Sequence, residues 1–99
     1  MNQLNSLILE GTVTKSAVYE DEKASFTISV ARYYKDTNGE IGEIKSYFDV
    51  VTGGAPAEKL HKKLTEGRVI RIVGQLRSEN VNNTNRVYIH AEHIEIKEA

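Results

Sequence analysis

The chain has 99 residues, enough for one domain, with 39% apolar and 27% charged residues. This composition is too apolar for a disordered chain and too charged for a membrane span. The absence of cysteine excludes disulfides and thiolate chemistry. The apolar run Leu7–Leu9 is too short for a signal peptide, so we expect a cytoplasmic protein. The net charge of −1 means that any phosphate-binding surface must be local and balanced by acidic residues elsewhere.

The first third of the chain predicts two strands. The first covers about residues 4–14, where apolar and polar residues alternate. Gly11 falls inside it, and a glycine inside a strand indicates a bulge or bend of the kind found in small barrels. After a polar loop, the second strand covers about residues 24–34, with Phe26 and Ile28 on its inward face.

The middle of the chain predicts a third strand and one helix. The Asn38-Gly39 pair is typical of a hairpin turn and leads into a strand over about residues 43–52. A helix is predicted over residues 55–65, because Leu60 and Leu64 lie one turn apart on its apolar side.

Two further strands complete the pattern, over about residues 68–78 and 86–97, with a polar loop at residues 80–85. Three strands, a helix and two strands predict an all-β domain over residues 1–99. We expect the five-stranded Greek-key barrel known as the oligonucleotide/oligosaccharide-binding (OB) fold, with its helix between strands three and four. A ferredoxin-like sandwich would need a second helix, and an SH3-like barrel has no real helix.

Three segments of the sequence, in the right order, resemble the bacterial single-stranded DNA-binding protein family. They are residues 5–11 (NSLILEG), 47–60 (YFDVVTGGAPAEKL) and 67–77 (GRVIRIVGQLR). The resemblance covers nearly the whole chain. It implies an OB fold that binds single-stranded DNA without sequence preference, in replication, repair or recombination. It also implies a cytoplasmic, nucleoid-associated homotetramer without cofactor or catalysis.

The resemblance also implies which residues bind. Tyr34 and Tyr47 match two positions at which bases stack on aromatic rings, and we expect both rings on one open wall of the barrel. Two further aromatic positions are occupied by Gly53 and Val81, which halves the stacking platform. One base on one ring is worth about 1–3 kcal/mol, so phosphate contacts must supply the rest. The candidate cations are Arg32, Lys35, Lys45, Arg71, Arg77 and Arg86.

Each of these residues also has a plainer interpretation. Tyr34 and Tyr47 could be ordinary half-buried strand tyrosines, and the cations could solvate a strand face or line a subunit interface. The other three tyrosines, Tyr19, Tyr33 and Tyr88, are interpreted mainly as packing or interface residues.

Residues 9–13 (LEGTV) and 90–95 (HAEHIE) also resemble the ends of primosomal replication protein N, a dimeric OB protein of replication restart. The sequence ends at Ala99, shortly after the last predicted strand, without the acidic tail through which single-stranded DNA-binding proteins recruit partners. We therefore keep an alternative function, a replication-restart module whose main role is to recruit replication or repair proteins.

The sequence does not favour an enzyme or a metal site. His90 and His93 are three residues apart, a spacing that places side chains on opposite faces of a regular strand, so we expect no shared metal ion. His61 has no evident partner. Gly53-Gly54 lacks the lysine of a phosphate-binding loop, and no nucleophile motif frames the serines.

Overall fold

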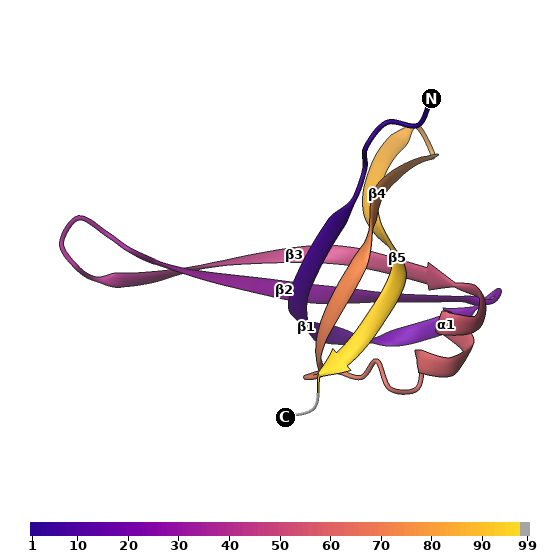
Figure 1. Ribbon diagram of the computed structural model, residues 1–99, viewed down its shortest axis with the longest axis horizontal. Helices are drawn as coiled ribbons and strands as arrows, with labels where there is room; N and C mark the ends of the chain where they lie inside the picture. The colour runs from indigo at the N-terminus through magenta and orange to yellow at the C-terminus, as the bar shows by residue number, and fades with distance from the viewer. Residues whose placement is uncertain (98–99) are drawn as a thin grey trace.

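The computed structural model describes residues 1–97. In chain order the elements are β1 (Leu7–Glu20), β2 (Lys23–Lys35), β3 (Ile41–Gly53), α1 (Gly54–Leu60), β4 (Val69–Val81) and β5 (Thr84–Lys97). The strands form a closed barrel in the order β1-β2-β3-β5-β4, and β3 and β5 are its parallel pair (Figure 1). The predicted five-stranded barrel with its helix between the third and fourth strands is therefore confirmed. No helix within residues 1–97 is long and apolar enough to cross a bilayer.

The core is built from the alternating inward side chains of all five strands. Its buried members are Val13, Phe26, Ile28, Val50, Ile70, Ile72, Ile89, Ala91 and Ile94, with Leu64 from the segment after the helix. Period-two alternation brings these side chains to the same side of a closed sheet, so the apolar pattern of the sequence predicted most of them.

The helix ends at Leu60 and is therefore shorter than the predicted range of 55–65. One further turn follows, in which the Leu64 amide donates to the Leu60 carbonyl at 3.1 Å, and the backbone from Leu64 onward bonds to β1. The Ala17 amide donates to the Leu64 carbonyl at 2.9 Å, and the Gly67 amide donates to the Val13 carbonyl at 2.8 Å. Leu64 is nevertheless buried, as its place on the apolar side of the predicted helix required.

Two segments predicted as loops belong to strands. β1 continues to Glu20 and meets β2 through a two-residue turn, Asp21-Glu22, and both turn residues have positive φ. In the same way, β4 and β5 extend to a turn at Asn82-Asn83, also with positive φ. Left-handed backbone at both central positions is the geometry of tight hairpins, and asparagine tolerates it well. Polar sequence alone did not separate these exposed strand ends from loops.

Gly11 marks a close approach of two strands, and the strand irregularities expected there occur later. A Cβ at Gly11 would lie 2.6 Å from the Ser29 carbonyl oxygen of β2. The pairing of β1 with β2 shifts register between Val13 and Lys15 and again between Lys15 and Val18. The glycine therefore lets two backbones approach, and the strand bends just after it.

A bulge in β5 corrects the expectation about the two histidines. Val73 pairs with His93 and Gly74 pairs with Ala91, so Glu92 is an extra residue without a partner on β4. Because the extra residue reverses the alternation, His90 and His93 both point to the outside of the barrel. The expectation that the two histidines lie on opposite faces was therefore wrong. Among residues 1–97, however, no three His, Cys, Asp or Glu side chains are grouped as metal ligands.

Two hairpins project from the barrel (Figure 1). β2 and β3 pair along their whole length, from Lys23 with Gly53 to Lys35 with Ile41. In the described chain β1 leaves β2 beyond Ser29, and β3 meets β5 at Val50 and Val51. Residues 30–35 and 41–46 therefore form a free two-stranded ribbon, the β2–β3 arm. The β4–β5 hairpin projects in a second direction, beside the N-terminal segment.

Candidate nucleic-acid interface

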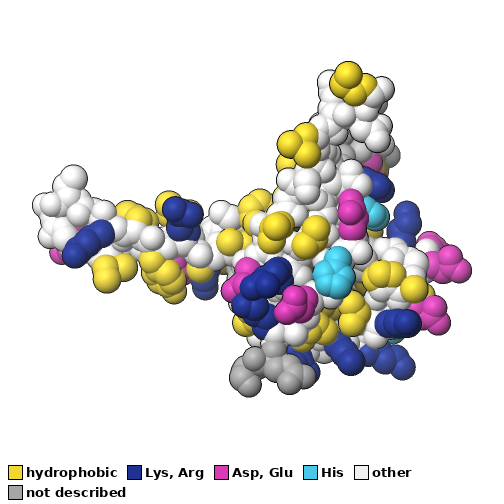
Figure 2. Space-filling model, viewed as in Figure 1, with side chains coloured by type: hydrophobic (Ala, Val, Ile, Leu, Met, Phe, Trp, Pro, Cys, Tyr) yellow, Lys and Arg dark blue, Asp and Glu magenta, His cyan; other side chains and the backbone are white. Residues whose placement is uncertain are grey.

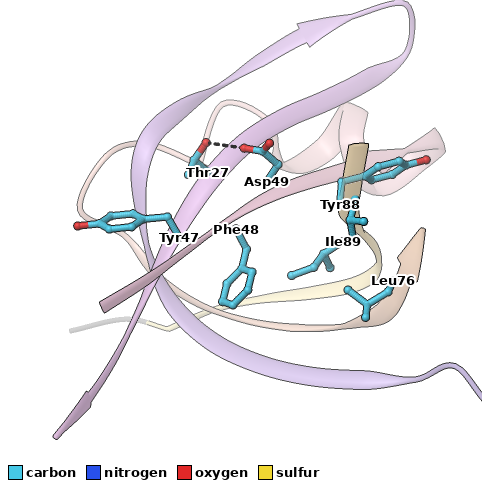
Figure 3. Close-up of a pocket in the computed structure, with 8 residues that line it drawn as sticks. Thr27, Tyr47, Phe48, Asp49, Leu76, Tyr88 and Ile89 are labelled. Atoms are coloured by element: carbon cyan, nitrogen blue, oxygen red, sulfur yellow. Dashed lines mark hydrogen bonds between the residues drawn. The ribbon is translucent and has the colours of Figure 1, made fainter. Parts of the chain in front are cut away.

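A groove lies where the edge of β3 faces the β4–β5 hairpin (Figure 3). Its volume is about 400 Å³. The groove is lined by Thr27, Tyr47, Phe48, Asp49, Leu76, Val87, Tyr88 and Ile89. It exists because β3 before Val50 has no partner on the β5 side within the described chain. Hydrophobic side chains gather on this side of the molecule, at the junction of the arm with the barrel (Figure 2).

The apolar lining of the groove is open to solvent. Tyr47 and Tyr88 lie at opposite ends with their hydroxyls directed outward, and Phe48 and Ile89 lie between them (Figure 3). Ile89 is buried and supports the floor, whereas Leu76 at the rim is exposed. An exposed apolar surface bearing a free ring face suits stacking of a nucleic-acid base, because every base has a π face.

The polar groups at the groove are already bonded to other protein groups. The Thr27 hydroxyl donates to Asp49 Oδ1 at 3.3 Å (Figure 3). Arg86 pairs with Asp49 at 3.5 Å and with Glu79 at 3.0 Å, and its guanidinium lies 5.6 Å from the centre of the Tyr88 ring. These ion pairs are exposed and individually weak, so a phosphate can compete for Arg86.

Arg77 adds a second cation beside the groove. It lies directly opposite Tyr88 in the β4–β5 ladder and has no ion-pair partner among residues 1–97. Arg77 and Arg86 are therefore the two predicted cations that the structure brings to this groove.

The two predicted stacking tyrosines are exposed, 49% for Tyr34 and 62% for Tyr47, but they do not share one wall. Tyr47 pairs with Ser29 and Tyr34 pairs with Gly42, so period-two alternation places the rings on opposite faces of the arm. The expectation of a common wall was wrong. The Tyr34 ring covers Gly42, where a Cβ would lie 2.4 Å from the ring.

The remaining predicted cations fall into two places. Lys35 and Lys45 share the arm face of Tyr47, and Lys45 pairs with Glu43 at 3.8 Å, whereas Arg32 shares the face of Tyr34. Arg71 lies apart, on the outer face of the barrel.

Arg71 is occupied there by an acidic partner. It bonds to Glu10 at 3.3 Å, and Lys97 also bonds to Glu10, at 2.9 Å. Lys97 and, to a lesser extent, Arg71 lower the pKa of the Glu10 carboxyl through hydrogen bonds and charge. The alternation of β4 keeps Arg71, Gln75 and Arg77 on one face, as expected, but the six-residue separation of the two arginines spans about 20 Å.

Comparison with known proteins shows the family to which the chain belongs. The model of the single-strand binding protein family matches residues 4–97. The chain belongs to the single-strand binding protein family. Among its relatives, the single-stranded DNA-binding protein of Staphylococcus epidermidis is 31% identical over 93 residues, which cover 90% of this chain and 70% of that protein. The replication restart protein PriB of Shewanella pealeana is 29% identical over 97 residues, covering 94% of this chain and 96% of that one.

The fold of this family member is also found among solved structures. A Plasmodium falciparum SSB solved in complex with ssDNA superposes with a TM-score of 0.82 at 19% identity, covering 99% of this chain and 98% of that one. The OB fold and the family expected from the sequence are both confirmed.

Several residues of the candidate interface were not among the predicted site residues. Tyr88 was interpreted mainly as a packing or interface residue, and it borders the groove together with Phe48, Leu76 and Val87. Tyr33 was given the same interpretation, and it is 67% exposed. Finding Tyr33 from the sequence would have required the register of the β2–β3 hairpin, because only the register shows that Tyr33 and Tyr47 share a face.

Proposed function

We propose that this chain binds single-stranded DNA without sequence preference and without catalysis, and coats exposed strands during replication, repair or recombination. The observation that carries the proposal is the open apolar groove beside Tyr47, with Arg77 and Arg86 at its rim. Membership of the family supports it, as do the name of the Staphylococcus epidermidis relative and the ssDNA complex of the Plasmodium falciparum protein.

The groove favours stacking over the reading of base edges. Its lining is mostly apolar, and the polar side chains Thr27 and Asp49 already bond to each other. A base can therefore gain contact area without a defined hydrogen-bond pattern, which makes binding tolerant of sequence. In a duplex the base faces are covered by neighbouring pairs, so the same surface selects against double strands.

Cations beside this surface would hold the sugar-phosphate chain. Five of the predicted cations lie on the arm or at the groove: Arg32, Lys35, Lys45, Arg77 and Arg86. If about three to five of them contact phosphates, log K should fall with log salt with a slope of about −2 to −3.5.

The proposal is tested by titrating a fluorescently labelled oligo-dT, with a duplex of equal length as the control. We expect oligo-dT to bind more tightly than the duplex. Its affinity should fall roughly 20- to 100-fold between about 50 and 200 mM salt, because counterions are released from the strand on binding. Equal binding of the duplex, or an affinity that salt leaves unchanged, would contradict a stacking and phosphate-binding surface.

The assembly and location follow from the same proposal. We propose a homotetramer in the cytoplasm, associated with the nucleoid through its DNA, with replication or repair proteins as further partners. The match to PriB of Shewanella pealeana along 96% of that protein favours a second candidate, a replication-restart module that mainly recruits proteins. The native mass separates the two, because a tetramer supports strand coating and a dimer supports the restart module.

A further inference from the structure

Tyr33 is an exposed ring on the β2–β3 arm, on the same face as Tyr47. Tyr33 pairs with Glu43, and Tyr47 pairs with Ser29. Residues directly opposite in an antiparallel ladder share a face, as do alternate residues of one strand, so the two rings point to the same side. Tyr33 is also more exposed than any other tyrosine among residues 1–97, at 67%.

The separation of the two rings suits different nucleotides of one strand. Tyr47 lies four positions along β3 from Glu43, the partner of Tyr33, which corresponds to about 13 Å along the ribbon. Stacked nucleotides rise by only about 3.4 Å each, so the rings cannot serve neighbouring stacked bases. At least one nucleotide would lie between them.

The surface between the two rings carries small side chains and one cation. Ser29 and Ala31 are small, and Lys45 lies directly opposite Ala31. Tyr33 and Lys45 also border one hollow of about 390 Å³ at the foot of the arm. Between Tyr47 and Tyr33, a strand crossing this surface would meet Lys45 as the one large side chain of the two paired strands.

The Glu43 carboxylate belongs to the residue directly opposite Tyr33 in the ladder. Hydrogen bonding to this carboxylate and its negative charge both raise the pKa of the Tyr33 hydroxyl. Glu43 is in turn 3.8 Å from the Lys45 ammonium. Glu43 is therefore partly neutralised by Lys45, and Glu10, which borders the same hollow, is paired with Arg71 and Lys97.

We propose that Tyr33, and not its neighbour Tyr34, is the second base-stacking residue of the chain, so that a single strand runs from the groove at Tyr47 outward along this face of the arm. This inference rests on the proposed single-stranded DNA binding. Tyr34 faces the other way and covers Gly42, which assigns it to the structure of the arm. Lys35 and Lys45 would then meet the phosphates along the same path.

The neighbouring tyrosines provide a matched pair for the test. Tyr33→Leu and Tyr34→Leu make the same chemical change on opposite faces of one strand, and both would be titrated with labelled oligo-dT. We expect Tyr33→Leu to raise Kd about five- to a hundredfold, and Tyr34→Leu to change it less than about twofold. An equal loss in the two variants, or a larger loss in Tyr34→Leu, would overturn the proposal.

A second readout covers the case in which a leucine variant fails to fold. The chain has five tyrosines and no tryptophan, so its intrinsic fluorescence reports the tyrosines directly. Tyr33→Phe should reduce the quenching of that fluorescence by saturating oligo-dT, and Tyr34→Phe should not. Unchanged quenching in Tyr33→Phe would also overturn the proposal.

The wild-type protein and a Tyr47→Leu variant separate the possible failures. If the wild-type protein does not bind oligo-dT, the proposed function itself fails. If the wild-type protein binds and Tyr47→Leu weakens binding while Tyr33→Leu does not, the function stands and only the path along the arm is wrong.

Discussion

Replacing Tyr47 with alanine should weaken binding of single-stranded DNA by about 1–3 kcal/mol, a rise in Kd of about 5- to 150-fold. The ring is 62% exposed at the end of the groove, so it is available to a base and contributes little to the core. The free energy of unfolding should therefore change by no more than about 0.5 kcal/mol. Titration with labelled oligo-dT and a urea melt measure the two effects.

Tyr19→Ala is the control for this change. Tyr19 is also an exposed strand tyrosine, but it stacks on His61 at a ring separation of 4.2 Å, near the turn that joins β1 to β2. Its removal should leave Kd within about twofold, since stacking energy depends on contact with the base. If Tyr47→Ala bound single-stranded DNA like the wild-type protein, or if both variants lost affinity equally, Tyr47 would not be part of the binding site.

Gly74→Ala should destabilise the protein by about 3 kcal/mol, because it forces a side chain into closely packed backbone. A Cβ at this position would lie 2.1 Å from the His90 carbonyl oxygen and 3.1 Å from the Ala91 Cα. These atoms belong to the backbone beside the β5 bulge, which cannot rotate away as a side chain can. For a domain of this size the thermal midpoint should fall by roughly 12–24 °C.

Gly53→Ala provides the comparison for Gly74→Ala. Gly53 has an extended backbone, and a Cβ there would have its nearest neighbours at 3.9 Å. Its midpoint should stay close to that of the wild-type protein, because such a contact is ordinary packing. If the thermal midpoint of Gly74→Ala also equalled that of the wild-type protein, β4 would not approach the β5 bulge as closely as described.

The faces on which the tyrosines lie could not be predicted from the sequence, because they depend on the register of the β2–β3 hairpin. A two-residue turn at Asn38-Gly39 would pair Thr37 with Glu40. With that register, Tyr34 would lie on the same face as Tyr47, which is the arrangement expected from the sequence. A shift of one residue reverses every face of a strand, so the turn geometry decides the outcome.

The structure has a longer connection, residues 36–40, between Lys35 and Ile41. The Asp36 carboxylate accepts hydrogen bonds from the backbone amides of Asn38 and Glu40, both at 2.8 Å. An aspartate that caps its own turn in this way competes with the tight Asn-Gly hairpin. The sequence contains both signals, and only the structure shows that the aspartate prevails.

The core residues followed directly from the sequence pattern, whereas the groove did not. Inward residues such as Ile28, Val50 and Ile72 were predictable, because burial enforces period-two alternation on a barrel strand. The groove was not predictable, since it depends on where β3 leaves β5 and on the approach of the β4–β5 hairpin. Both are contacts between segments far apart in sequence.

The distribution of charges shows how cations remain available in a chain of low net charge. Acidic partners occupy the cations at two places, Glu10 beside Arg71 and Asp49 with Glu79 beside Arg86. Other cations on the arm and at the groove have no ion pair among residues 1–97; they are Arg32, Lys35 and Arg77. These cations lie on both faces of the arm and beside the groove, although the chain has a net charge of −1.

The central claim is that the groove and the adjoining face of the β2–β3 arm receive the unpaired strand. Titrating the ¹⁵N-labelled protein with oligo-dT and following its amide resonances by NMR tests this most directly. We expect the largest shifts at Tyr47, Leu76 and Tyr88 and along the arm to Tyr33. Shifts confined to α1 and the turn at Asp21-Glu22, with the groove and the arm unchanged, would contradict the account.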